Sequence, residues 1–60
     1  MTDRLLTLKD VIAITKMGKT HIYERIKAND FPKPYPLGPR MVRWRESEIQ
    51  NWIANLPRQE

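Results

Sequence analysis

The chain has 60 residues, of which 11 are Lys or Arg and 7 are Asp or Glu, so its formal net charge is +4. A domain this short buries only roughly 60% of the surface that its unfolded chain exposes, so we expect one small core and marginal stability. The sequence has no cysteine, which excludes disulfides, thiolate metal sites and a cysteine nucleophile. It also lacks the ~20-residue apolar run of a membrane span and the apolar segment of a signal peptide, so we expect a cytoplasmic protein with no membrane partner.

The excess positive charge is concentrated in the middle of the chain. Residues 16–45 hold eight basic and two acidic side chains, whereas residues 1–15 are neutral and residues 46–60 carry a charge of −2. Such clustering is expected where a protein meets a polyanion. The alternative is a solvated, lysine-rich surface, and net charge alone does not decide between the two.

The first predicted element is a short helix that begins after Thr7 and ends near Thr15. Thr7 and Asp10 have the spacing of a capping box, and the carboxylate of Asp10 lies on the favourable side of the helix dipole. A helical apolar stripe follows, formed by Leu8, Val11, Ile12 and Thr15. Leu5 and Leu6 precede the cap, and we expect both to join the core.

A second helix is predicted after a turn of three or four residues, with Gly18 as its N-cap. Ile22 and Ile26 lie on its buried side, because residues four apart share one face of a helix. The opposite side is polar: its centre is formed by Thr20, Glu24 and Lys27, and its flanks by His21 and Tyr23. Asn29 is expected to adopt a left-handed conformation beyond the helix, with Pro32 as a stop signal. Two short helices joined in this way form a helix-turn-helix.

The proline-rich segment FPKPYPLGPRMVRW predicts a two-stranded hairpin. Its first prolines hold the chain extended and exclude a helix, and Pro36 places the first strand at an edge. After the last proline, Val42 and Trp44 alternate with Met41 and Arg43, as in a half-buried strand. The tip is expected at residues 37–40, with Gly38 at positive φ in a type II′ turn.

The last predicted element is a helix with Glu46 and Glu48 in its first turn and Pro57 just beyond its end. Its apolar stripe consists of Ile49, Trp52, Ile53 and Leu56. Arg45 is expected either to pair with Glu48 or to cap this helix. The aromatic residues on the apolar stripes or next to the turn are expected in the core, not as base-stacking platforms.

The runs LLTLKDV, KTHIYERI and FPKPYPLGPRMVRWRESEIQNWI resemble the AlpA family of small prophage regulators, which are winged helix-turn-helix proteins related to excisionases and to the MerR-type DNA-binding head. The resemblance implies a single domain over residues 1–60, mainly α with a small β-hairpin wing and an ordered core of about residues 5–56. It also implies that the second helix enters the DNA major groove while the wing rests on the backbone or the adjacent minor groove. Members of the family usually carry Gly at the position of Lys16 and Arg at that of Glu24, so the base that this helix reads does not carry over.

Eight side chains are predicted to contact DNA. They are Lys19, Thr20, His21, Tyr23, Glu24 and Lys27 on the second helix, and Arg40 and Arg43 on the wing. Those predicted to face base edges and flanking phosphates are Thr20, His21, Glu24 and Lys27, while the other four anchor the backbone. Structural alternatives exist: Thr20 can cap the helix, Tyr23 can belong to the core, and the arginines can keep an edge strand from pairing.

No motif indicates catalysis, a cofactor or a metal site, because His21 lacks partner ligands and there is no glycine-rich phosphate loop. The leading hypothesis is a sequence-specific transcriptional regulator of a phage or prophage-like element, bound to double-stranded DNA of the bacterial nucleoid. One alternative is an excisionase that bends attachment-site DNA for an integrase, and another is a protein-interaction module that inhibits a regulator. Because one domain has a small footprint, we expect a homodimer or a cooperative oligomer on DNA. RNA polymerase and an integrase are the candidate protein partners.

Overall fold

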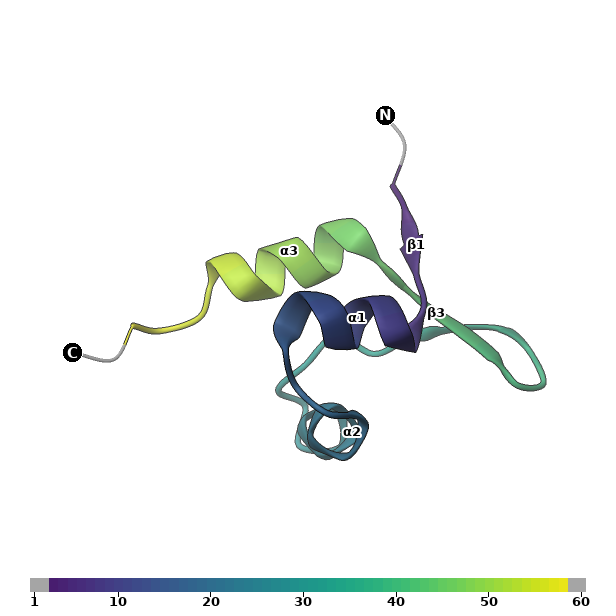
Figure 1. Ribbon diagram of the computed structural model, residues 1–60, viewed down its shortest axis with the longest axis horizontal. Helices are drawn as coiled ribbons and strands as arrows, with labels where there is room; N and C mark the ends of the chain where they lie inside the picture. Colours follow the sequence, from purple (N-terminus) through teal and green to yellow (C-terminus); the bar gives the residue numbers. More distant parts are fainter. Residues whose placement is uncertain (1–2, 59–60) are drawn as a thin grey trace.

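The computed structural model describes residues 3–58 as three helices and three short strands, with a hairpin that extends away from the helices (Figure 1). In chain order these are β1 (Leu5–Leu6), α1 (Leu8–Thr15), α2 (Lys19–Lys27), β2 (Tyr35–Gly38), β3 (Met41–Arg45) and α3 (Glu46–Ala54). The strands form one antiparallel sheet in the order β1-β3-β2. The protein is therefore a winged helix-turn-helix, as predicted, with the β2–β3 hairpin as its wing.

Strand β1 was not predicted from the sequence. Leu5 pairs with Arg45 and Leu6 with Trp44, so the start of the chain is tied to the base of the wing. Side chains alternate across a strand, and accordingly Leu6 is fully buried whereas Leu5 is 51% exposed. The expectation that both leucines join the core is therefore wrong for Leu5. A strand of two residues shows no readable alternation, because that signal needs at least four residues.

The core of residues 3–58 draws on every helix and on the sheet. Its buried members are Leu6, Val11, Ile22, Phe31, Trp44 and Ile49. The indole Nε1 of Trp44 donates a hydrogen bond to the carbonyl oxygen of Pro32 at 2.9 Å. Trp52 is half-buried, packs edge-on against Phe31 with 4.7 Å between ring centroids, and donates to the carbonyl oxygen of Asp30 at 2.9 Å. The two tryptophans thus hold residues 30–32 against the sheet and α3. This agrees with the prediction that the aromatic residues contribute to the core.

Helices α1 and α3 turn their predicted apolar stripes toward this core. The capping box of α1 is formed in both directions, with bonds of 3.0 Å and 3.1 Å between Thr7 and Asp10. Helix α3 ends at Ala54, and Leu56 lies beyond it with 47% of its surface exposed, so its predicted place in the stripe is wrong. Of the helices within residues 3–58, none has the length and apolarity needed to cross a membrane.

The turn of the wing differs from the predicted one. Gly38 pairs with Met41, which leaves Pro39 and Arg40 as the two turn residues. The φ of Gly38 is not positive, so the expected type II′ turn is wrong. Proline fixes φ near −65°, the value that suits the first central position of a common β-turn. The turn is therefore shaped by Pro39 and not by a left-handed glycine.

The start of α3 is capped from the other end of the chain. Arg45 occupies the N-cap position but makes no side-chain capping bond. Instead, the carboxylate of Asp3 accepts bonds from the backbone N–H of Ser47 at 3.0 Å and from its hydroxyl at 2.8 Å. The carbonyl oxygen of Arg4 accepts from the N–H of Glu46 at 2.8 Å. A carboxylate at this end of a helix is also favoured by the helix dipole.

We predict that the fold loses stability in acid because of Asp3 and Asp10. The N–H of Ser47 lowers the pKa of Asp3, and that of Thr7 lowers the pKa of Asp10, each from 3.8. The ionised carboxylates therefore stabilise the folded state. Because their folded-state pKa values are lowered, this contribution to stability is present above about pH 4 and is lost as the pH falls through those values. The melting temperature, followed by circular dichroism, should therefore drop between about pH 5 and pH 2.

The Asp3→Asn variant has one titrating group fewer, so its melting temperature should depend less on pH over the same range. An identical acid dependence of the variant and the wild-type protein would contradict the role of Asp3.

Candidate nucleic-acid interface

A three-residue turn sets the direction of α2. Helix α1 ends at Thr15, and its C-cap is Lys16, whose φ of 63° lies in the left-handed region and whose N–H donates to the carbonyl oxygen of Ile12 at 2.8 Å. Gly18 is the N-cap of α2, as predicted, and its carbonyl oxygen accepts from the N–H of Ile22 at 3.0 Å. In Figure 1 α2 is seen nearly end-on beneath α1, so the two helices cross steeply, as in a helix-turn-helix.

Helix α2 turns its predicted polar side to the outside. Ile22 is fully buried, and Ile26 is half-buried against the core. The six predicted contact residues on this helix are all exposed: Lys19, Thr20, His21, Tyr23, Glu24 and Lys27. The orientation expected from the helical period is therefore confirmed, while contact of these residues with DNA stays a prediction.

The exposed side of α2 is shallowly hollowed along its length. The hollow is lined by Lys19, Thr20, Tyr23, Glu24, Ile26 and Lys27. His21 is outside this set, and its Nε2 accepts a hydrogen bond from Nε of Arg25 at 3.3 Å. His21 therefore lies at the edge of the candidate interface, which agrees with its predicted place on the flank.

Arg25 faces the body of the protein, although it is one of the basic residues of α2. Its Nη1 donates to Oδ2 of Asp30 at 2.7 Å, and its guanidinium carbon lies 5.8 Å from the centroid of the Trp52 ring. The chain reverses at Asn29, which has a positive φ of 59° as predicted. Arg25 thus joins the end of α2 to α3. Sequence reasoning missed this role because Asp30 and Trp52 lie off the helix that carries Arg25.

The wing places its two predicted arginines differently. Arg40 is exposed in the two-residue turn. Arg43 is half-buried, and its Nη1 donates to the carbonyl oxygen of Val42 at 2.7 Å. Arg40 can reach a phosphate without breaking a contact, whereas Arg43 must share or give up a bond to the backbone.

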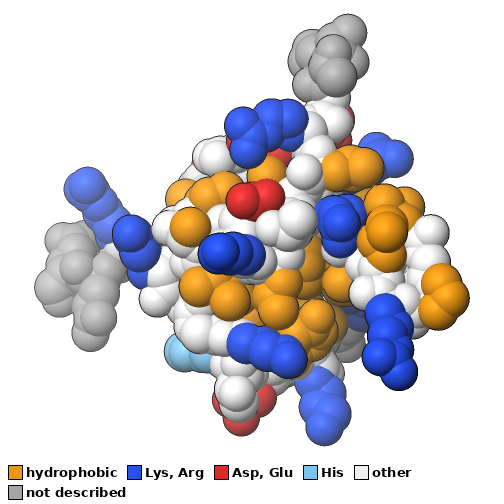
Figure 2. Space-filling view, turned by 45° about the vertical axis from the view of Figure 1, so that its right-hand side comes forward, with side chains coloured by type: hydrophobic (Ala, Val, Ile, Leu, Met, Phe, Trp, Pro, Cys, Tyr) orange, Lys and Arg blue, Asp and Glu red, His pale blue; other side chains and the backbone are white. Residues whose placement is uncertain are grey.

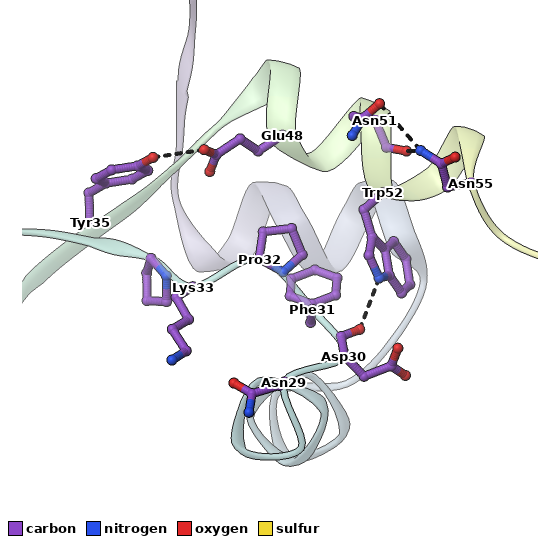
Figure 3. Close-up of a pocket in the computed structure, with 11 residues that line it drawn as sticks. Asn29, Asp30, Phe31, Pro32, Lys33, Tyr35, Glu48, Asn51, Trp52 and Asn55 are labelled. Carbon is purple, nitrogen blue, oxygen red and sulfur yellow. Dashed lines mark hydrogen bonds between the residues drawn. The ribbon is translucent and has the colours of Figure 1, made fainter.

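The base of the wing is fastened to α3 by Tyr35. Its hydroxyl donates to Oε2 of Glu48 at 2.7 Å (Figure 3), and this hydrogen bond raises the pKa of the phenol. The guanidinium carbon of Arg45 lies 5.0 Å from the centroid of the Tyr35 ring. Of the two alternatives predicted for Arg45, pairing with Glu48 is wrong, because the tyrosine ring offers the guanidinium a face on the neighbouring strand. The other is met in position, since Arg45 is the N-cap residue of α3, although its side chain makes no capping bond.

Both α2 and the wing carry more basic than acidic side chains. The segment from Phe31 to Arg45 contains no Asp or Glu, and Glu24 is the one acidic residue of α2. In Figure 2 several Lys and Arg side chains are spread over the lower and right-hand parts of the surface, with apolar side chains between them. This mixture suits a polyanion that also offers apolar surface, as nucleic acids do.

A second open hollow lies between residues 29–35 and α3 (Figure 3). Its walls include the rings of Phe31 and Trp52 and the amides of Asn51 and Asn55. Nδ2 of Asn55 donates to the carbonyl oxygen of Asn51 at 2.8 Å. None of the eight predicted contact residues lines this hollow, so it lies outside the candidate interface.

Residues 4–58 match the protein family described as "Prophage CP4-57 regulatory protein (AlpA)". The chain belongs to the AlpA family. This AlpA-family chain is 33% identical over 52 residues to "Uncharacterized protein ORF88" of Enterobacteria phage P4, covering 87% of the chain and 59% of that protein. It is 48% identical over 42 residues to "Response regulator inhibitor for tor operon" of Escherichia coli K12 and to "Probable excisionase hkaC" of Shigella phage Sf6.

Each of these latter matches covers 70% of the AlpA-family chain and 62% of the relative. The chain thus spans about three-fifths of the length of these curated relatives. No solved structure matches it significantly.

We predict that Lys16→Gly stabilises this AlpA-family protein. The left-handed conformation costs lysine, which has a Cβ, roughly 1–2 kcal/mol, and glycine avoids this cost. Against this gain, glycine loses more conformational entropy than other residues on folding, which costs about 0.5–1 kcal/mol. The free energy of unfolding should therefore rise by up to ~1 kcal/mol, or about 4–8 °C in melting temperature.

Lys9→Gly is the matched control for this prediction. Lys9 lies within α1, so the same exchange should lower stability by about 1 kcal/mol. Equal destabilisation by both substitutions, in thermal melts, would contradict strain at Lys16.

Proposed function

We propose that this protein is a sequence-specific, double-stranded DNA-binding regulator of a phage or prophage-like element, acting in the bacterial cytoplasm. The observation that carries the proposal is the polar side of α2, where the six predicted contact residues are all exposed. The wing adds exposed basic side chains and has no acidic residue. Membership of the AlpA family supports the regulatory role.

The proposal places α2 in the major groove. The nine residues of α2 form a rod about 13 Å long and 10–12 Å wide, and the major groove is about 12 Å wide. The first turn of a recognition helix reaches deepest, which brings Thr20 to base edges. The carboxylate of Glu24 can accept a hydrogen bond from the N4 amino group of cytosine. Lys27, together with His21 at the edge, reaches flanking phosphates.

The remaining predicted contacts hold the DNA backbone. Lys19 and Tyr23 flank the base-reading residues on α2, while Arg40 and Arg43 lie on the wing. Contacts of this kind set register and affinity, whereas base contacts determine sequence preference. Tyr35 and Glu48 support this arrangement, because their hydrogen bond ties the wing to the body that carries α2.

The proposed function predicts binding that weakens steeply with salt. If about five phosphates are neutralised, log affinity should fall against log salt concentration with a slope of roughly −4 to −5. Lys27→Ala and Arg40→Ala should each weaken binding and make the slope shallower by about 1. Fluorescence anisotropy on duplexes that the protein itself selects from a random pool measures both quantities.

Lys9→Ala is the control for these variants, because Lys9 is an exposed lysine of α1 outside the candidate interface. It should leave the slope unchanged. A slope near zero for the wild-type protein, or no binding to any duplex at low salt, would sink the proposed function.

Two other functions are supported by particular relatives. One relative is named a probable excisionase and another a response regulator inhibitor, and both are 48% identical to the chain over 42 residues. The first name favours a factor that bends attachment-site DNA for an integrase. The second favours a domain that docks on a regulatory protein. Similarity does not rank the two, because the identity and coverage are equal.

A genetic experiment separates these roles. Deleting the gene and measuring prophage excision and neighbouring transcription separately should change transcription if the protein is a regulator, and excision if it is an excisionase. Reversing charge with Lys27→Glu and Arg40→Glu should abolish either activity, since both need DNA. Wild-type activity of that double variant would instead support docking on a protein.

A further inference from the structure

The wing exposes two large apolar side chains beside its tip. Leu37 of β2 and Met41 of β3 are 52% and 47% exposed, and they flank the turn formed by Pro39 and Arg40. The pairing of β2 with β3 skips Leu37, which is therefore an extra residue in its strand. Such a bulge changes the direction of a side chain and is common near functional sites.

Folding does not account for these two side chains. Both lie outside the core and outside the half-buried residues that pack against it. Met41 has Gly38 directly opposite on β2, so it has no cross-strand side chain to pack on. Exposed leucine and methionine at a hairpin tip are therefore surface that another molecule can cover.

The charges along the wing segment indicate which molecule that is. The segment from Phe31 to Arg45 carries no acidic residue, and its basic residues are Lys33, Arg40, Arg43 and Arg45. An apolar tip in such surroundings is complementary to a polyanion with an apolar interior. Base pairs stacked between two phosphate backbones have that character. The DNA minor groove, about 6 Å wide, is too narrow for a helix but accepts single side chains.

We propose that the wing inserts Leu37 and Met41 as an apolar wedge into the minor groove beside the α2 site and bends the duplex there. Proteins that insert leucine, methionine or proline between base steps kink DNA by roughly 20–90°. Arg40 holds the phosphates next to the wedge. This inference rests on the proposed DNA-binding function and adds to it a deformation of the DNA and a preference for flexible pyrimidine–purine steps under the wing.

The base of the wing is fixed to the rest of the domain, as insertion of its tip into DNA requires. The Tyr35–Glu48 hydrogen bond of 2.7 Å ties β2 to α3. Strand β3 also pairs with β1 and carries Trp44, which is fully buried. The base of the hairpin is therefore fixed to α3, to β1 and to the core.

The test compares bending by the wild-type protein with that by the Leu37→Ser/Met41→Ser double variant. The probes are duplexes of about 30 base pairs, selected from a random pool by the wild-type protein. Energy transfer between dyes at the two ends reports bending, and 2-aminopurine placed at successive positions reports unstacking. Leu56→Ser is the matched control, because Leu56 is 47% exposed and follows α3. The carboxy-terminal end of α3 points away from the wing (Figure 1).

We expect the wild-type protein and the control to bend the duplex by roughly 20–90° and to brighten 2-aminopurine at one step. The double variant should bind with the same salt slope and lose both signals. Thermal melts should match those of the wild-type protein, since both substitutions are at exposed positions. If the double variant does not bind at all, Leu37→Ser and Met41→Ser are tested separately. Reduced bending with retained binding in these single variants supports the wedge, and unchanged bending overturns it.

The other outcomes separate the wedge from the proposed function. Binding by the wild-type protein without bending, or equal bending by the double variant, overturns the wedge and leaves DNA binding in place. Unchanged bending with loss of cooperative binding would assign Leu37 and Met41 to a contact between copies, which also overturns it. Failure of the wild-type protein to bind any duplex at low salt overturns both.

Discussion

The burial of Trp44 connects the parts of this domain that would otherwise move separately. Its side chain is fully buried, its indole N–H bonds to Pro32, and its strand pairs with β1 on one side and β2 on the other. The same core contains Ile22, which decides the side of α2 that faces outward. Wing and helix are therefore parts of one packed body, and their spacing is set by the core.

This shared core explains how so short a chain can present two contact surfaces. A domain of this size has little apolar surface to bury, and polar contacts supplement the core at its edges. Arg25 ties the end of α2 to Asp30 and Trp52, while Tyr35 ties the wing to Glu48. Each contact joins elements on which the candidate interface depends, so they contribute to positioning as much as to stability.

The helices were predictable from the sequence because their apolar residues repeat at the helical period and their ends carry recognisable caps. The exposed side of α2 followed from the same period. Strand β1 was not predictable, because two residues show no alternation, and the wing turn was predicted wrongly because Gly38 pairs in the ladder instead of turning. The roles of Arg25 and Arg45 depend on partners in other elements, which no local pattern reveals.

Because Asp3 caps α3, the start of this helix depends on the amino-terminal segment of the chain. The bonded groups are 44 positions apart in sequence. Removing the amino-terminal segment would leave the first turn of the carboxy-terminal helix without its hydrogen-bond acceptor. The helix would then be destabilised at a point far along the chain from the deleted residues. Truncations designed to map binding would then disturb helix content first, and a loss of activity in them would report unfolding, not the removal of a contact.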